Sequence, residues 1–332
     1  MNRSQFLSAL VASAFGLLAS ACGVQGDKGE ALFVVESSWA KATPIALEST
    51  FAVNASRSSL FKTALTVESA DPTVFVAQGG AFRAAGEGLG RFRAVDPSTK
   101  EEVDTITYEV AKPSQASLSY WADKILDPQS RLPVDFALAS GSQPQVRVEL
   151  TDKLDRPMNH KGIAKLTADA ASHITFVDKT FHQEASAGAP GSGKVELAVA
   201  GAGGKSALTK SYGSQVVDAK DIASLTIASG AVVLNLNNLD KNKPNQPPAE
   251  DADAKEPSDQ STVYVLVLQA KTAGGVRVYG AAGTWTVVDG TAKPTHLDKP
   301  SEVNYLTLQK GEKVTLQVEL NGKTTKTTVT GQ

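Results

Sequence analysis

Residues 313–329 read K-V-T-L-Q-V-E-L-N-G-K-T-T-K-T-T-V and predict a β-hairpin. Over residues 314–320, Val and Leu alternate with Thr, Gln and Glu, which is the period-two pattern of a strand with one buried face. Asn321-Gly322 follows directly, and Asn-Gly is a strongly favoured dipeptide in two-residue hairpin turns. The stretch therefore indicates an antiparallel pair of strands.

The same alternation recurs along most of the chain. Apolar and polar residues alternate at 92–94, 106–110, 146–150 and 283–287, and turns rich in Gly, Pro, Asp and Asn separate these short runs. No long stretch has the 3.6-residue period that the helices of an α/β fold need. We therefore expect an all-β chain of sandwiches or barrels, with Trp285 in a core.

Length and composition limit the class of protein. The chain has 332 residues, 41% of them hydrophobic, which suits two or three domains with sizeable cores. Its 33 Lys and Arg residues nearly balance 35 Asp and Glu residues, so no charge excess points to nucleic acid. One cysteine excludes a disulfide within the chain and a cysteine-rich metal site.

An internal repeat indicates three domains. The sequence A-S-L-S at 116–119 recurs as A-S-L-T 107 positions later, a spacing that suits one β-sandwich. We expect domains at 31–112, 113–221 and 222–332. A Pro- and acid-rich stretch at 240–260 is expected to be an extended loop inside the third domain.

The first 21 residues have the layout of a secretory signal. Arg3 precedes an apolar run over residues 6–18, and the small residues Ala-Ser-Ala follow at 19–21. The run is too short to span a membrane, and no later stretch reaches the roughly 18 apolar residues of a spanning helix. We expect residues 1–21 to be removed and the remainder to be exported.

Cys22, the single cysteine, stands directly after this signal, and the arrangement resembles a bacterial lipoprotein signal. The resemblance implies that Cys22 is diacylated, carries palmitate and becomes the mature N-terminus, which anchors the chain to a membrane. Gly23 rather than Asp follows it, which implies the outer membrane. Residues 22–30 are expected to form a lipidated tether. Alternatively, signal peptidase I cuts after the Ala-Ser-Ala triplet and leaves a free thiol.

The segment at 70–94 resembles the group 2 bacterial Ig-like repeat. Its parts are Ala70–Val76, Gly79–Ala84 and Gly86–Ala94, which match a turn with a V-x-V strand, a glycine turn with a short strand, and a second glycine-rich strand. Glycines suit that crossing because tight turns need positive φ angles.

A second segment is similar to the invasin-type group 1 repeat. Val146–Asp152, Pro157, Gly162-Ile163 and Gly193–Leu197 match its V-x-V-x-D opening, its Pro and Gly positions and its later strand. A third copy is looser, with core positions at Tyr279, Trp285 and Val287. The resemblance implies three tandem Ig-like β-sandwich domains, of a kind common as stalks, spacers and adhesive surfaces in exported bacterial proteins.

Motifs that carry chemistry are weak in this chain. Gly188–Val195 is close to a P-loop, but it lacks the magnesium-binding hydroxyl and a strand rather than a helix is expected after it. His173 and His182 would meet across a hairpin as a weak metal site at most, and the acidic run at 250–256 lacks the calcium-loop pattern. We therefore expect no catalytic residues, no cofactor and no metal.

One pair of aromatic residues is a candidate ligand surface. Tyr120 and Trp121 are adjacent and are the best placed aromatic side chains for stacking on a sugar. The alternative is that both pack into a core, as is expected for Trp285.

These observations favour a non-catalytic, membrane-anchored cell-envelope lipoprotein with a structural or adhesive role. Its expected partners are the membrane, through the N-terminal lipid, and an envelope protein or polysaccharide, but no nucleic acid. The alternative is a periplasm-facing accessory lipoprotein that scaffolds an envelope assembly. A carbohydrate-active enzyme ranks third, because no acid/base pair of carboxylates stands out.

Overall fold

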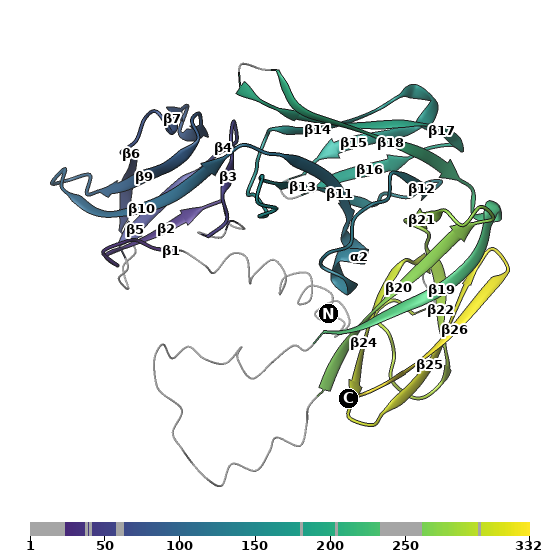
Figure 1. Ribbon diagram of the computed structural model, residues 1–332. Coiled ribbons are helices and arrows are strands. Elements are labelled where there is room, and N and C mark those ends of the chain that lie inside the picture. Colours follow the sequence, from purple (N-terminus) through teal and green to yellow (C-terminus); the bar gives the residue numbers. More distant parts are fainter. Residues whose placement is uncertain are drawn as a thin grey trace, which may run out of the picture.

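The computed structural model describes residues 24–36, 39, 42–57, 63–179, 182–202, 205–232, 261–297 and 300–332. The expected signal at 1–21, Cys22 and the loop at 240–260 lie outside these residues. Strands arranged in packed sheets dominate the described chain and helices are few, so the all-β prediction is confirmed (Figure 1). We use module 1 for residues 24–112, module 2 for 113–221 and module 3 for 222–332; this division follows the expected domains.

Module 1 packs a large sheet against a small one. The large sheet has the order β1 (Val24–Gln25), β2 (Ala31–Val35), β5 (Val53–Arg57), β6 (Ala64–Ser69), β9 (Gly88–Val95), β10 (Glu102–Ala111), β3 (Ile45–Ala46). The small sheet has the order β4 (Thr50–Phe51), β8 (Ala81–Ala84), β7 (Phe75–Gln78). Phe92 lies between them, with its ring centroid 4.4 Å from that of Phe75 and 4.8 Å from that of Phe82. The alternation predicted at 92–94 therefore forms a core strand.

Residues 24–31 pack onto the rest of module 1, although residues 22–30 are expected to form a tether. Strand β1 pairs with β2. The fully buried carboxylate of Asp104 accepts hydrogen bonds from the backbone N–H groups of Lys28, Glu30 and Ala31 at 2.8 to 2.9 Å. The segment is small and polar, which predicts a loop, but a carboxylate more than 70 positions away satisfies its N–H groups and fixes it.

Module 2 also has two facing sheets. One has the order β11 (Gln115–Tyr120), β13 (Gln145–Thr151), β16 (Gln183–Ala187), β15 (Ile174–Asp178). The other begins with β14 (Ala164–Ala168), β17 (Gly191–Ala200), β18 (Ser206–Val217) and β12 (Asp135–Ala139). A six-residue helix, α2 (Trp121–Leu126), follows β11, and 3-10 turns lie at Ala170–Ser172 and Ala219–Asp221. The P-loop-like run leads into strand β17, as expected from the sequence.

Module 3 contains the hairpin predicted at 313–329. One face consists of β19 (Ile222–Val232), β20 (Ser261–Thr272), β24 (Val303–Gln309) and β21 (Arg277–Tyr279). The other has the order β23 (Pro300–Ser301), β22 (Gly283–Asp289), β25 (Lys313–Leu320), β26 (Lys323–Thr330). Asn321 and Gly322 join β25 to β26 with φ angles of 49° and 75°, as a two-residue hairpin turn requires. Trp285 is fully buried, so its predicted core position is confirmed.

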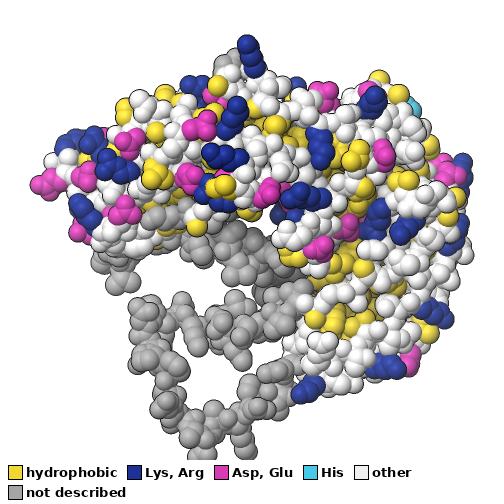
Figure 2. All heavy atoms as spheres, in the orientation of Figure 1, with side chains coloured by type: hydrophobic (Ala, Val, Ile, Leu, Met, Phe, Trp, Pro, Cys, Tyr) yellow, Lys and Arg dark blue, Asp and Glu magenta, His cyan; other side chains and the backbone are white. Residues whose placement is uncertain are grey.

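The three modules form an arch, with module 1 at one end and module 3 at the other (Figure 1). Over the face shown in Figure 2, basic and acidic side chains are interspersed rather than gathered by sign. Within the described ranges, no helix has both the length and the apolar character needed to cross a bilayer.

Candidate functional site

Two cavities among the described residues carry little chemistry. The larger, of about 450 Å³, lies between β5, β6 and the β7–β8 hairpin, and its lining has no titratable side chain. The second, of about 160 Å³, has Asp135 as its single titratable lining residue. Among the described residues, no group of three or more His, Cys, Asp and Glu side chains is placed to hold a metal ion.

The histidines considered as a metal pair lie at opposite ends of the β15–β16 hairpin. His173 precedes β15 and its Nδ1 lies 3.1 Å from the carbonyl oxygens of Ala189 and Pro190. His182 lies beside Lys179 at the other end, where the backbone N–H of Lys179 donates to its carbonyl at 2.9 Å. The hairpin therefore keeps these two side chains apart.

Tyr120 and Trp121, the predicted stacking pair, lie where module 2 meets module 3. Tyr120 is only 6% exposed, and its ring is 4.8 Å from the ring of Tyr279 in a T-shaped contact. Trp121 begins helix α2, is half-buried and packs against the core of module 2. The ring of Tyr120 is thus covered by module 3, while ligand stacking by Trp121 stays a prediction.

The joint between modules 1 and 2 is held by backbone hydrogen bonds. Asn159 of module 2 forms a parallel bridge with Ile45 of module 1. Its carbonyl accepts from the N–H of Ala46 and its N–H donates to the carbonyl of Pro44, both at 2.8 Å, and its Nδ2 donates to Thr43 at 3.2 Å. Because these bonds resemble those of a sheet, they restrict rotation between the two modules.

Two charged side chains of module 2 strengthen this first joint. Lys161 donates to both carboxylate oxygens of Glu36 at 2.8 and 2.9 Å. Arg156 donates to both carboxylate oxygens of Glu109 at 2.8 and 2.6 Å, and its hydrogen bonds lower the pKa of Glu109. The two hydrogen bonds of the Arg156–Glu109 pair fix the orientation of the two groups as well as their separation.

The joint between modules 2 and 3 is a continuous sheet. Strand β12 pairs in parallel with β18 of its own module and with β21 of module 3. Ala137 lies opposite Val278 and Leu138 opposite Tyr279, and all four residues are buried. One sheet therefore runs from β14 across the expected domain boundary to β19.

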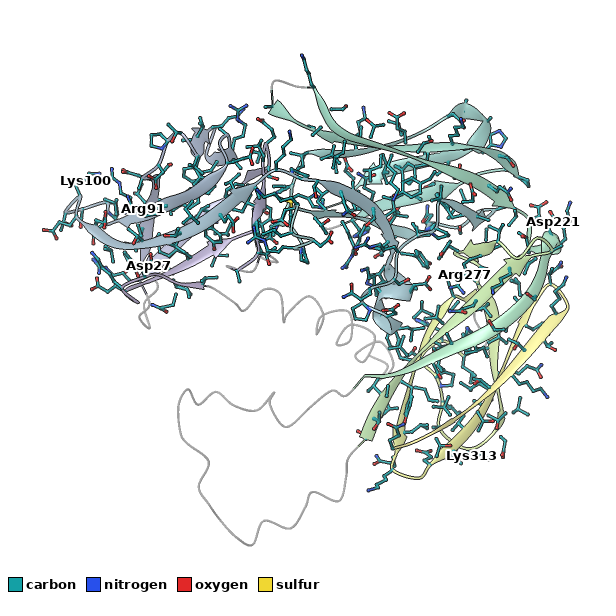
Figure 3. The ribbon with its side chains drawn as sticks, in the orientation of Figure 1. Asp27, Arg91, Lys100, Asp221, Arg277 and Lys313 are labelled. Carbon is teal, nitrogen blue, oxygen red and sulfur yellow. The ribbon has the colours of Figure 1, made fainter. Side chains whose placement is uncertain are left out.

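A buried polar group, which we call the joint cluster, lies against this continuous sheet. Its members are Tyr120, Asp123, Arg277, Tyr279 and Glu302. The hydroxyl of Tyr120 and the backbone N–H of Gly280 both donate to Oε2 of Glu302, the second at 3.0 Å. Arg277 donates to Asp123 at 3.0 Å and lies 5.2 Å from the ring centre of Tyr279. Figure 3 shows Arg277 at this junction.

Burial dominates the electrostatics of the joint cluster. It raises the pKa of Glu302 to about 7, although the Tyr120 hydrogen bond and the Arg277 charge favour the carboxylate. Burial also raises the pKa of Asp123, against the effect of Arg277, and raises the pKa of Tyr279 to about 12. Oε1 of Glu302 and Nε and Nη1 of Arg277 are buried and have no hydrogen-bond partner among the described groups.

Sequence reasoning did not single out Glu302 or Arg277. Tyr120 and Glu302 are 182 positions apart, and each lies in an ordinary strand context in the sequence. A carboxylate enclosed between two modules is suited to fixing an orientation rather than to binding a substrate. The joints are therefore the best-defined sites in the described chain.

No protein family and no curated protein matches this chain. Solved structures give distant likenesses. Domains 4–9 of the surface layer protein SbsC align with 84% of this chain and 42% of that one at 17% identity and a TM-score of 0.32. The Escherichia coli adhesin FdeC aligns with 93% of this chain and 99% of its own, at 13% identity and a TM-score of 0.25. The D00-D0 domain of intimin aligns with 65% of this chain and 98% of its own, at 15% identity and a TM-score of 0.24.

The chain spans 42%, 40% and 41% of the length of three SbsC structures that it matches. At these identities and TM-scores the likenesses carry no conclusion about function. The architecture is consistent with tandem Ig-like β-sandwiches.

Proposed function

We propose that this chain is a non-catalytic, lipid-anchored protein of the bacterial cell envelope whose three Ig-like modules form a stiff structural or adhesive arm. The observation that carries the proposal is the parallel pairing of β12 with β21, which makes one sheet of two modules. Bending that joint requires breaking buried backbone hydrogen bonds, whereas modules joined by a linker alone rotate freely.

The first joint supports the same role. Sheet-like bonds around Asn159 and the ion pairs of Arg156 and Lys161 hold module 1 to module 2. A spacer gains a fixed length and direction, because every contact that resists bending preserves the position of its far end.

The N-terminal anchor is supported by the sequence and by the position of strand β1. Cys22 follows a stretch with the layout of a secretory signal, and only Gly23 separates it from Val24 in strand β1. Two residues span about 7 Å at most. An acylated Cys22 would therefore place module 1 directly on the membrane surface, with modules 2 and 3 extending from it.

The stiffness of the arm is tested by small-angle X-ray scattering of the purified Cys22→Ala chain. At low salt and pH 5.5, a stiff arm gives a maximum dimension and a profile that one arched conformation reproduces. A profile that only a broad set of bent conformations reproduces would contradict the proposal.

The anchor and the side of the membrane are tested in cells. Mass analysis of the mature N-terminus should find acyl chains on Cys22, and Cys22→Ala should release the protein from membranes; retention of that variant would contradict the anchor. Digestion by protease added to intact cells supports a surface adhesin, and protection supports a periplasm-facing scaffold. Turnover of a glycoside by purified protein would overturn the non-catalytic proposal.

A further inference from the structure

We propose that Glu302 is a proton-dependent latch of the joint between modules 2 and 3: with a proton bound, the two modules are held in one orientation, and without it the joint loosens. This inference goes beyond a structural or adhesive arm, because it makes the stiffness of that arm depend on pH.

Glu302 is placed to affect both modules at once. It lies between β23 and β24 of module 3, and its Oε2 receives the hydroxyl of Tyr120, which ends β11 of module 2. The second donor, the N–H of Gly280, directly follows β21, the strand that pairs with β12 of module 2. A change at this carboxyl group therefore acts on the two segments that join the modules.

Charge counting explains why a proton matters. The titratable groups around Glu302 are Tyr120 from β11, Asp123 from α2, and Arg277 and Tyr279 from β21. Arg277 is the single cation among them and is hydrogen-bonded to Asp123 at 3.0 Å, with both side chains mostly buried. With Glu302 protonated the group is neutral overall, and with Glu302 ionised it carries one net negative charge in the interior.

The hydrogen bonds do not compensate that charge. Both donors reach Oε2, while Oε1 is buried and has no partner among the described groups. A buried charge without full hydrogen bonding is strongly unfavourable, and water entering the joint relieves it. The structure can admit water there by separating α2 and the end of β11 from module 3.

The pH at which this occurs lies near neutrality. Burial raises the pKa of Glu302 to about 7, above the value of an exposed glutamate. A raised carboxyl pKa means that the folded joint binds the proton more tightly than the opened one. The joint is therefore most stable below the pKa of an exposed glutamate, and it loses this contribution as the pH rises to about 7.

The test measures the distance between modules 2 and 3 as the pH changes. Spin labels are attached at Lys165→Cys on β14 and Lys326→Cys on β26, both exposed, in the Cys22→Ala chain. We expect one narrow distance distribution at pH 5.5 that broadens with a midpoint near the pKa of about 7. An unchanged distribution from pH 5.5 to 8.5 would overturn the latch.

Variants identify the group responsible. Glu302→Gln should keep the distribution narrow at every pH, whereas Glu319→Gln, at an exposed position of β25, should behave as the parent. If the distance distribution of Glu302→Gln still broadens as the pH rises, the assignment to Glu302 is overturned. Should that variant not fold, Tyr120→Phe provides the readout: loss of a donor to the carboxylate should raise the midpoint by about one pH unit. A midpoint that stays in place or falls would contradict the proposal.

The latch and the proposed function fail separately. If the arm is flexible at every pH, scattering contradicts the arm itself. If the arm is stiff at every pH and the spin-label distances do not change, the arm stands and the latch is overturned.

Discussion

The guanidinium of Arg156 in module 2 donates hydrogen bonds of 2.8 and 2.6 Å to the two carboxylate oxygens of Glu109 in module 1. The same guanidinium donates to Asp152 of its own module at 2.8 Å. One cation thus lies between carboxylates of two modules, and it connects the loop that follows β13 to strand β10. Its side chain is 39% exposed, so salt and water weaken this connection.

Removing this cation should loosen the first joint without unfolding either module. We expect Arg156→Ala to broaden the distribution of distances between spin labels on modules 1 and 2. Added salt should also broaden this distribution in the parent chain. The matched control is Arg93→Ala, because Arg93 forms a similar pair with Glu68 inside module 1. Equal effects of the two substitutions on the distance distribution would show that Arg156 does not hold the joint.

The N-terminal segment should detach when Asp104 loses its charge. Burial raises the pKa of Asp104, but hydrogen bonds from the backbone N–H groups of Lys28, Ala31, Thr105 and Glu30 outweigh it, so the net pKa is lowered. A lowered pKa gives stability that is present above the usual value of about 4 and is lost as the pH falls through the lower folded value.

Hydrogen exchange checks this prediction. Amide protection of residues 28–31 should fall below about pH 4 while the β9–β10 pairing persists. Asp104→Asn should weaken protection at neutral pH by about 1 to 3 kcal/mol. Gly26→Ala should act similarly, because an added Cβ would lie 2.2 Å from Oδ2 of Asp104. Unchanged protection in both variants would show that Asp104 does not fix this segment.

Trp285 should be among the most costly residues of module 3 to truncate. Its side chain is fully buried and its Nε1–H donates to the carbonyl of Ser301 at 2.8 Å. We expect Trp285→Ala to lower the free energy of unfolding by about 3 to 5 kcal/mol in urea titrations. Val288→Ala on the same strand, 50% exposed, should change it by less than about 0.5 kcal/mol. A small effect of the tryptophan substitution would contradict a packed core.

The turn that joins β25 to β26 should depend on Gly322. Its φ is 75°, and a Cβ there would meet no atom within 4 Å, so the cost of substitution is conformational. We expect Gly322→Ala to destabilise module 3 by about 1 to 2 kcal/mol, measured by thermal unfolding. Gly274→Ala, where φ is not positive and the nearest atom is 3.9 Å away, serves as the control. Equal shifts in Tm would argue against the left-handed turn.

Sequence patterns were sufficient to predict structure that depends on residues close to one another in the sequence. The alternation over 314–320 and Asn321-Gly322 predicted a hairpin that the structure contains, and Trp285 in an alternating strand is in the core. These predictions need only the two-residue period of a strand and the φ angles that a tight turn demands.

Contacts between distant residues could not be predicted in this way. Residues 24–30 look like a tether until Asp104 is brought beside them, and Tyr120 looks available until module 3 covers it. No local pattern marks Asp104 or the covering surface of module 3 as a partner. The sequence around a residue does not show whether its side chain is buried against a distant segment.

The sequence alone determined the all-β class, the hairpin of residues 313–329 and the expected export signal with Cys22, because periodicity, turn chemistry and signal layout are local properties. The tertiary structure alone decided how the modules are joined. The pairing of β12 with β21, the bonds around Asn159 and the enclosure of Glu302 depend on surfaces that meet only after each module has folded.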